Sequence, residues 1–311
     1  EVHILALDAP VGKKTAQHAD LGRFTGPVQS FEYYEHRLIP DYLSFYPSIS
    51  RPARYPRSIR TALGVSCRAG VSRPFHKLHH MQLAAQEAWE ARDTDAFAAA
   101  AGPAAVQRAC LPDNTPEHYR AFARRCAARR IRILPYDDPD YPLAFSRICD
   151  MPLVLYCTGD PRWLNEPGAV GIVGSRKPTE YGLNAAADIG GELAKNGAVI
   201  VSGLADGLDS AGHRAAVKND CPTIAVMGVP IDRTYPATNA ALRQQIERKG
   251  CVISEYPPYS EYIGPTCFLQ RNRLIAALSS AVLVVEAREK SGTMSTVAHA
   301  ERYGKPVYAV P

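Results

Sequence analysis

The chain has 311 residues, of which 46% are hydrophobic and 22% charged, an ordinary balance for a globular protein with room for two compact domains. Its formal net charge of +5 permits nucleic-acid binding without demonstrating it. The eight cysteines form no C-x-x-C pair and have no histidine at ligand spacing, which argues against a zinc site or a disulfide framework and predicts reduced thiols in a cytoplasmic protein.

Residues 1–57 form an extension that is rich in Pro and Tyr and shows neither a helical nor a strand period, so we assign no fold to it. It lacks the basic-then-apolar pattern of a signal peptide. No apolar run in the sequence approaches the roughly 20 residues that a membrane span needs. We therefore expect no membrane span.

Residues 58–135 have a helical pattern. Met81–Ala101 is Ala-rich with apolar side chains at near-helical spacing, and Tyr119–Arg130 is predicted to be a short basic helix. We expect a small helical domain here. Six arginines lie on the basic helix or just after it: Arg120, Arg124, Arg125, Arg129, Arg130 and Arg132. They can form a solvated helix surface or contact a nucleic-acid backbone, and both interpretations stay open.

From Ala169 onward, short β-branched runs alternate with helical stretches. The expected strands are Ala169–Val173, Ala198–Ser202, Thr223–Gly228, Cys251–Ser254, Ala281–Glu286 and Pro306–Val310. The expected helices are Tyr181–Asn196, Asp209–Asn219, Asn239–Lys249, Gln270–Ser279 and Thr293–Tyr303. Parallel strands need long crossovers, which are usually helical, so this alternation predicts a mostly parallel sheet covered on both faces. The predicted fold of residues 136–311 is α/β, Rossmann-like and doubly wound. We also expect this domain to be truncated at its C-terminus, because the sequence stops directly after a strand.

The loops that follow the first two of these strands are candidates for phosphate binding, since ligands of such folds bind outside the carboxyl ends of the strands. Gly174, Ser175 and Arg176 follow the first strand, and the helix after them offers free N–H groups to an anion. The alternative is a tight turn with a solvated arginine. The second strand ends in Ser202 and Gly203.

Two polar residues of the next helix favour structural roles. We expect Asp209 to be the N-cap of that helix rather than a catalytic carboxylate. His213 is expected to be packed or hydrogen-bonded within the helix, because no second ligand or nucleophile lies at a useful spacing.

The last two loops complete the candidate site. Phe268, Arg271 and Arg273 stand at a predicted helix start, where arginines beside an exposed aromatic can hold a phosphate backbone and stack a base. The alternative is a buried phenylalanine with the arginines paired to Glu255 or Glu286. A second phosphate cradle is expected at a further helix start, formed by Ser291, Gly292 and Thr293.

Two common nucleotide-binding motifs are absent from this sequence. No G-x-G-x-x-G follows the first strand, and G-x-x-x-x-G-K-[ST] does not occur. Neither ordinary dinucleotide binding nor P-loop hydrolysis is supported, and we expect no cofactor, no metal and no catalytic residue.

Taken in order, these motifs closely resemble the signature of the DNA-processing protein A (DprA/Smf) family. The matching series is Gly174-Ser175-Arg176, Tyr181-Gly182, Ser202-Gly203-Leu204-Ala205, Gly207, Asp209, His213, Tyr235-Pro236, Ser254-Glu255-Tyr256-Pro257, Phe268, Arg271-Asn272-Arg273, Glu286 and Ser291-Gly292-Thr293. Ala62–Ala91 resembles the N-terminal, sterile-alpha-motif-like helical domain of that family. Members of that family commonly have a basic residue shortly before the aromatic that matches Phe268. Here that stretch is Gly264-Pro265-Thr266-Cys267 and contains no basic residue.

The resemblance implies a protein that binds single-stranded DNA as a homodimer, protects it during natural transformation or recombination, and loads the RecA recombinase without catalysis. By position, it implies a DNA site formed by Arg176, Ser202, Gly203, Phe268, Arg271 and Arg273. An alternative is a phosphoribohydrolase-like enzyme acting on nucleoside monophosphates, whose P-G-G-x-G-T-x-x-E loop is not found in the comparable stretch, Ser291–Thr296. A partner-binding Rossmann module is the third possibility.

Overall fold

The computed structural model describes residue 95 and residues 116–148, 150–260 and 264–311. The predicted extension over residues 1–57 and the greater part of the predicted helical domain, up to residue 115, lie outside the described residues apart from Asp95. The predictions for these segments stay predictions.

The described chain is built on one eight-stranded sheet with the strand order β1-β2-β6-β5-β4-β3-β7-β8. The six strands from β6 to β8 pair in parallel, while β1 pairs with β2 and β2 with β6 in antiparallel fashion. The bounds are β1 Arg132–Pro135, β2 Val154–Gly159, β3 Ala169–Val173, β4 Val199–Ser202, β5 Thr223–Met227, β6 Cys251–Ser254, β7 Ala281–Val284 and β8 Val307–Ala309.

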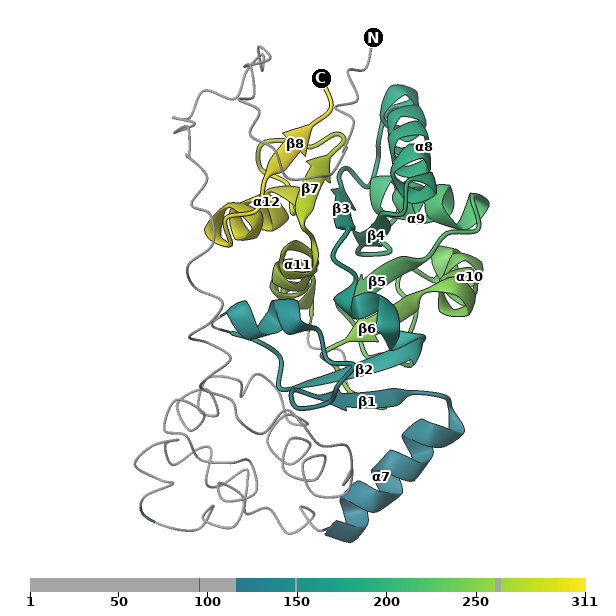
Figure 1. The fold of residues 1–311 in the computed structure, drawn as a ribbon, viewed down its shortest axis with the longest axis vertical. Helices are drawn as coiled ribbons and strands as arrows, with labels where there is room; N and C mark the ends of the chain where they lie inside the picture. Colours follow the sequence, from purple (N-terminus) through teal and green to yellow (C-terminus); the bar gives the residue numbers. More distant parts are fainter. Residues whose placement is uncertain (1–94, 96–115, 149, 261–263) are drawn as a thin grey trace. The chain divides into compact units, whose positions relative to one another are not determined.

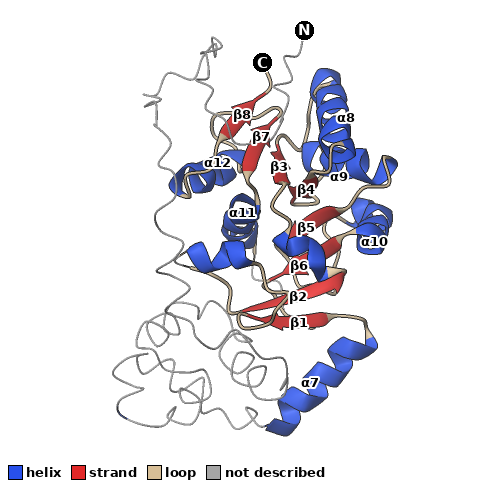
Figure 2. Ribbon diagram, in the orientation of Figure 1, coloured by secondary structure: helices blue, strands red, loops and turns tan. Residues whose placement is uncertain are grey.

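Helices cover both faces of this sheet (Figures 1 and 2). The bounds are α7 Pro116–Ala128, α8 Glu180–Lys195, α9 Leu208–Lys218, α10 Ala240–Lys249, α11 Thr266–Leu278 and α12 Thr293–Arg302, with 3₁₀ turns at Leu143–Arg147, Pro161–Asn165 and Ala237–Asn239. In both views α8, α9 and α10 lie on one side of the sheet and α11 and α12 on the other. The predicted α/β, Rossmann-like, doubly wound architecture is confirmed.

The central strands form because they are short apolar runs that become buried on both faces. Every residue of β4, β5 and β6 is buried. Apolar side chains of α11 pack on one face, where Leu274 and Ile275 join the core of Val201 and Val226. On the other face, α7 and α10 contribute to a second apolar cluster.

The predicted boundaries of β3 and β6 are correct to the residue, and β4, β5, β7 and β8 are one or two residues shorter than predicted. Two strands were missed. β1 lies within the segment assigned to the helical domain and is instead the edge strand of the sheet. Helix α11 begins at Thr266, four residues before the predicted start, because Pro265 precedes it and proline is tolerated at a helix start.

The chain reverses its direction across the sheet at β3, which lies between β4 and β7. From β3 the chain proceeds through β4 and β5 to β6, and α11 then carries it back to β7 on the other side of β3. Such a switch point is where ligands of open α/β sheets bind. The loops after β3 and β7 therefore flank the expected ligand position.

Candidate nucleic-acid interface

The loop after β3 is fixed by its neighbours on both sides. The Ser175 N–H donates to the Glu286 carbonyl at 2.7 Å, and the Ser175 carbonyl accepts from the Leu208 N–H at 3.1 Å. Gly207 has a φ of +79° and lies so close to Ser175 and Arg176 that a Cβ there would overlap their backbone. This packing holds the Arg176 side chain on the exposed side of the turn.

The N-terminus of α8 is occupied by a carboxylate of the protein itself. Glu286 Oε2 accepts from the N–H and from the hydroxyl of Thr179, each at 2.9 Å, and the Thr179 hydroxyl oxygen accepts from the Gly182 N–H at 3.1 Å. A negative charge is favoured at a helix N-terminus. The sequence predicted that a phosphate binds at this helix start. That prediction is corrected, because the Glu286 carboxylate already occupies the N-terminus of α8.

The second predicted phosphate cradle lies beside the first. The Thr293 hydroxyl donates to the Gly174 carbonyl at 3.1 Å, and Asn272 Nδ2 donates to the Gly292 carbonyl at 3.0 Å. Gly292 is exposed and precedes α12, while the Ser291 hydroxyl is buried without a hydrogen-bond partner among the described residues. The loops after β3 and β7 thus meet, as the sheet topology requires.

Arg176 lies beside the ring of Phe268, which in turn packs against the ring of Tyr235. Its guanidinium carbon is 5.7 Å from the centre of the Phe268 ring, within cation–π range, and the Phe268 and Tyr235 ring centres are 5.1 Å apart. Phe268 was expected to be exposed and is only half exposed, because it packs over Gly228 and the core under α10. Tyr235 is 51% exposed. No role was predicted for Tyr235 from the sequence, although Tyr235-Pro236 belongs to the series of matching motifs.

Arg271 is buried at the carboxyl ends of β4 and β5. Its Nη1 donates to the Gly203 carbonyl at 2.8 Å and to the Val226 carbonyl, and its Nε donates to Asn272 Oδ1 at 3.2 Å. A Cβ on Gly203 would overlap this guanidinium. Burial lowers the pKa of Arg271 to about 10, so the side chain stays charged at neutral pH. Arg271 therefore joins two strands to α11.

The loop after β4 is shaped by Asp209. The predicted N-cap role of Asp209 is wrong, because Gly207 is the N-cap of α9. Asp209 is buried in the first turn, where it accepts hydrogen bonds from the backbone N–H groups of Gly203 and Ala205. Burial raises the pKa of the Asp209 carboxyl. The Ser202 hydroxyl is also buried and donates to the Ile172 carbonyl at 2.6 Å.

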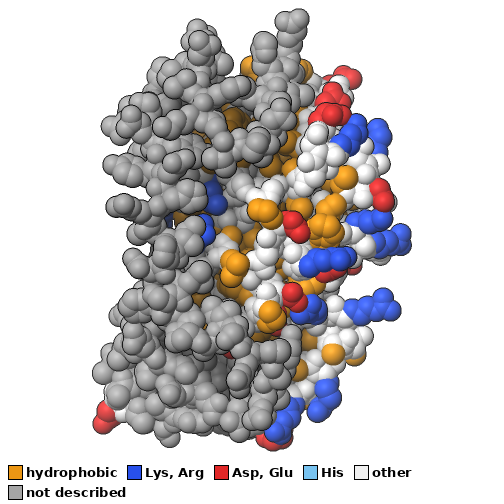
Figure 3. Space-filling view, viewed as in Figure 1, with side chains coloured by type: hydrophobic (Ala, Val, Ile, Leu, Met, Phe, Trp, Pro, Cys, Tyr) orange, Lys and Arg blue, Asp and Glu red, His pale blue; other side chains and the backbone are white. Residues whose placement is uncertain are grey.

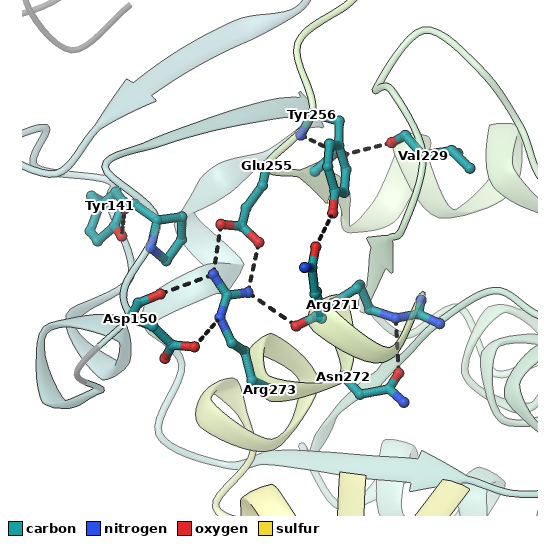
Figure 4. A network of polar contacts seen from close by, with 11 residues as sticks. Tyr141, Asp150, Val229, Glu255, Tyr256, Arg271, Asn272 and Arg273 are labelled. Carbon is teal, nitrogen blue, oxygen red and sulfur yellow. Dashed lines mark hydrogen bonds and ion pairs between the residues drawn. The ribbon is translucent and has the colours of Figure 1, made fainter. Parts of the chain in front are cut away.

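Arg273 makes the most extensive polar network of the site (Figure 4). Its two terminal nitrogens donate to the two Glu255 carboxylate oxygens at 2.6 and 2.7 Å. They also donate to the Gln270 carbonyl at 3.2 Å and to the Asp150 carbonyl at 2.9 Å, and Nε lies 2.9 Å from Asp150 Oδ2. A guanidinium has five N–H donors; the terminal nitrogens make four hydrogen bonds here, and Nε forms an ion pair with Asp150. The ion pair between Arg273 and Glu255, which was one of two alternatives predicted from the sequence, is present.

The eleven residues predicted for the site thus fall into two groups. Four of them are buried and contact other parts of the protein: Ser202, Gly203, Arg271 and Arg273. Exposed or half-exposed residues of the loops and of α11 are Gly174, Ser175, Arg176, Phe268, Ser291, Gly292 and Thr293. The exposed group is brought together at the switch point of the sheet, and we call it, with Tyr235, the strand-end site.

His213 is buried in α9, as expected from its sequence context. The Thr223 hydroxyl donates to the Ile200 carbonyl at 2.6 Å, so its oxygen accepts from His213 Nδ1 at 2.7 Å and fixes the Nδ1–H tautomer. Burial, with the positive charges of Arg271 and Arg214, lowers the pKa of His213 to about 3. The imidazole is therefore neutral at physiological pH.

This burial predicts a loss of stability in acid. The folded-state pKa of His213, about 3, lies below the ordinary value of 6.5, so between these values the unfolded chain binds a proton that the folded chain excludes. The stabilising effect is complete above pH 6.5, and about 2 kcal/mol of unfolding free energy is lost between about pH 7 and about pH 5. The raised pKa of Asp209 acts in the opposite direction. Denaturant unfolding at several pH values measures the sum.

A His213→Gln variant isolates the histidine contribution, because glutamine keeps an N–H donor for Thr223 and does not titrate. We expect its unfolding free energy to fall less than that of the parent chain over the same pH range. Parallel pH profiles for the two proteins would contradict the assignment.

Comparison with known proteins identifies the family. Residues 132–311, more than half of the chain, match the family model described as DNA recombination-mediator protein A. The chain belongs to this family. The match begins at the first residue of β1, so the whole eight-stranded sheet lies within the family domain.

Curated members of the family give consistent matches. The DNA processing protein DprA of Bacillus subtilis is 35% identical over 209 residues, which are 66% of this chain and 70% of that protein. The Smf protein of a Synechocystis species is 41% identical over 183 residues, covering 58% of this chain and 46% of that protein. The chain therefore spans about half the length of some curated relatives.

Two solved structures of the family are similar to this chain. The DprA structure of Streptococcus pneumoniae aligns with a TM-score of 0.66 at 29% identity, over 84% of this chain and 88% of that one. The Helicobacter pylori DprA structure aligns with a TM-score of 0.54 at 38% identity, over 58% of this chain and 81% of that one. The latter is described by its single-stranded DNA binding mode.

Two further properties of the described part of this family member concern metals and membranes. Among the described residues, no three His, Cys, Asp or Glu side chains are grouped so that they can hold a metal ion. No helix in the described ranges combines the length and apolar character needed to cross a membrane.

Proposed function

We propose that this chain binds single-stranded DNA at the strand-end site. The single observation that carries the proposal is the environment of Arg176. Among the described residues, no hydrogen bond or ion pair engages its guanidinium, and Arg176 stands exposed beside the Phe268 ring, against which Tyr235 packs. An arginine with unused donors beside accessible aromatic rings suits a phosphate backbone whose bases stack nearby.

The other arginines of the predicted site have a supporting role in this proposal. Arg273 makes four hydrogen bonds and an ion pair to protein acceptors, and Arg271 joins the ends of β4 and β5 to α11. Neither is needed as a direct phosphate ligand. They hold α11 in place, and α11 carries Phe268 to the Arg176 side chain. The exposed loops Gly174–Arg176 and Ser291–Thr293 supply the remaining polar groups.

The family relationship supports the same proposal, since the Helicobacter pylori relative is known for single-stranded DNA binding. We propose that the chain acts in DNA processing, in transformation or recombination, and does so without catalysis. His213 is buried and hydrogen-bonded to Thr223, and Glu286 is engaged by Thr179, so neither is placed as a base beside a nucleophile. This arrangement favours binding over a nucleoside monophosphate hydrolase.

The family resemblance also motivates finer proposals: a homodimer, loading of the RecA recombinase onto DNA, and action in the cytoplasm. The five described cysteines are free thiols, which fits a reducing compartment. We further propose the division into an extension over residues 1–57, a helical domain up to about residue 131, and a sheet domain from β1 onward. Sedimentation measures whether the chain forms a homodimer, and a RecA strand-exchange assay measures loading of the recombinase.

We expect the protein to bind an unstructured oligonucleotide more tightly than a duplex of the same length, with little preference for sequence. Fluorescence anisotropy with labelled strands measures both affinities. The affinity for the single strand should fall with salt, with a log–log slope of about −0.7 for each phosphate that is neutralised. Equal or tighter duplex binding, or a flat salt response, would remove the proposed backbone contact.

A further inference from the structure

A second cluster of arginines and an aromatic ring lies outside the strand-end site. The guanidinium carbons of Arg125, in the last turn of α7, and Arg129, directly after that helix, lie 5.1 and 4.8 Å from the centre of the Tyr259 ring. Both distances are within cation–π range. Tyr259 comes from the loop after β6 and is 41% exposed. Tertiary packing thus adds an accessible ring to the arginine run of α7, whose own Phe122 is buried.

The loop carrying Tyr259 is joined to the loop carrying Tyr235. The Ile231 N–H donates to the Tyr256 carbonyl at 3.2 Å, and Asp232 Oδ2 accepts from the Tyr259 N–H at 3.1 Å. Asp232 and Tyr235 are three residues apart, so their Cα atoms are separated by at most about 11 Å. Tyr235 packs against Phe268, and Asp232 of the same loop binds the Tyr259 N–H, so one short loop contacts both clusters.

Tyr259 is held in a fixed position. Its φ of +66° lies in the left-handed region, which a bulky side chain rarely adopts, and the bond from its N–H to Asp232 holds it there. The ring in turn orients Arg125 and Arg129. A preset ring and two preset guanidinium groups lose little conformational freedom when a ligand binds.

The charge of this surface is positive. Arg124, Arg125, Arg129 and Arg130 are all exposed. Asp232 is 3.9 Å from Arg129, a long and weak ion pair, and Glu117 pairs with Arg120 at 2.9 Å near the other end of α7. Figure 3 shows Lys and Arg side chains over α7 at the lower right of the view. The surface has the charge to attract phosphates.

We propose that a DNA single strand bound at the strand-end site continues over Tyr235 onto the surface formed by Tyr259, Arg125 and Arg129. The inference rests on the proposed function and extends the site to α7. Guanidinium planes and aromatic rings both stack with bases, and arginines also bind phosphate, so this surface repeats the chemistry of Arg176 beside Phe268. A strand long enough to reach it gains contacts that a short strand cannot make.

The test compares oligothymidines of about 4 and about 16 nucleotides, the range of site sizes known for single-strand-binding folds. We expect Tyr259→Leu to weaken binding of the longer strand about tenfold, in the range of base–aromatic stacking, and to leave the shorter strand unaffected. Tyr259→Phe keeps the ring and should bind as the parent does. Arg129→Ala should lower the salt slope by about 0.7 with the longer strand alone.

Arg120→Ala is the matched control, because Arg120 lies on the same helix but pairs with Glu117. It should change neither affinity. Unchanged binding of the longer strand by Tyr259→Leu, or an equal loss for both strands, would overturn the extended path. Arg176→Ala separates the two proposals: if it weakens neither strand, the strand-end site itself is wrong, whatever Tyr259 shows.

Discussion

Replacing Arg273 with methionine should lower the free energy of unfolding by about 3–5 kcal/mol, the range for removing one partner of a buried ion pair. The guanidinium side chain is 8% exposed and the Glu255 carboxylate 21%, so the variant leaves a poorly solvated charge without its partner. The change also removes the bonds to Asp150, before β2, and to Glu255, after β6, that link α11 to these segments. The midpoint of denaturant unfolding, at an unchanged m-value, measures the loss.

The double variant Arg273→Met with Glu255→Leu tests the cause. Replacing both members of a buried pair by apolar groups is often neutral, so the double variant should recover most of the stability lost by the single one. A single variant that changes stability by less than about 0.5 kcal/mol, as an exposed arginine would, contradicts the buried network. At a temperature where the single variant is folded, we expect it to retain most of its DNA affinity, since the Arg273 side chain is buried and paired with Glu255 and Asp150.

Unlike Arg273→Met, Arg176→Ala should lose DNA affinity and keep its stability. It should weaken single-strand binding by about tenfold or more. Hydrogen bonds to charged groups contribute about 1.5–3 kcal/mol, and each 1.4 kcal/mol is a factor of ten in affinity. The loss should be similar for every DNA sequence, because phosphate contacts carry no base information. The melting temperature should hardly change, since Arg176 is exposed and surface substitutions stay within about 0.5 kcal/mol.

The neighbouring Lys177→Ala is the matched control, because Lys177 is exposed on the same turn. It removes the same charge without the position beside Phe268, and its effect should be smaller. Arg129→Ala, in the turn after α7, should also have a smaller effect on short strands. Normal affinity in the Arg176 variant would mean that the strand-end site is not where DNA binds.

Much of the fold followed from the sequence because its pattern is local. Runs such as Ala169–Val173 and Cys251–Ser254 are continuous and apolar, and buried parallel strands have that composition. The alternation with helices then determined the parallel sheet. Because ligands of this architecture bind at the carboxyl ends of the strands, the sequence also located the loops at Gly174 and Ser291. β1 and β2 were missed because they precede the alternation of strands and helices and join the sheet in antiparallel fashion.

The tertiary structure decided which polar side chains of the site are free to bind. The sequence predicts Arg176, Arg271 and Arg273 for the DNA site, with Arg176 on phosphate. Of the three only Arg176 is exposed, because acceptors of the other two come from residues up to 123 positions away. The same holds for Glu286 at the start of α8 and for Tyr259 against α7. Periodicity reports on neighbours along the chain, whereas burial and hydrogen-bond satisfaction depend on segments that meet only after folding.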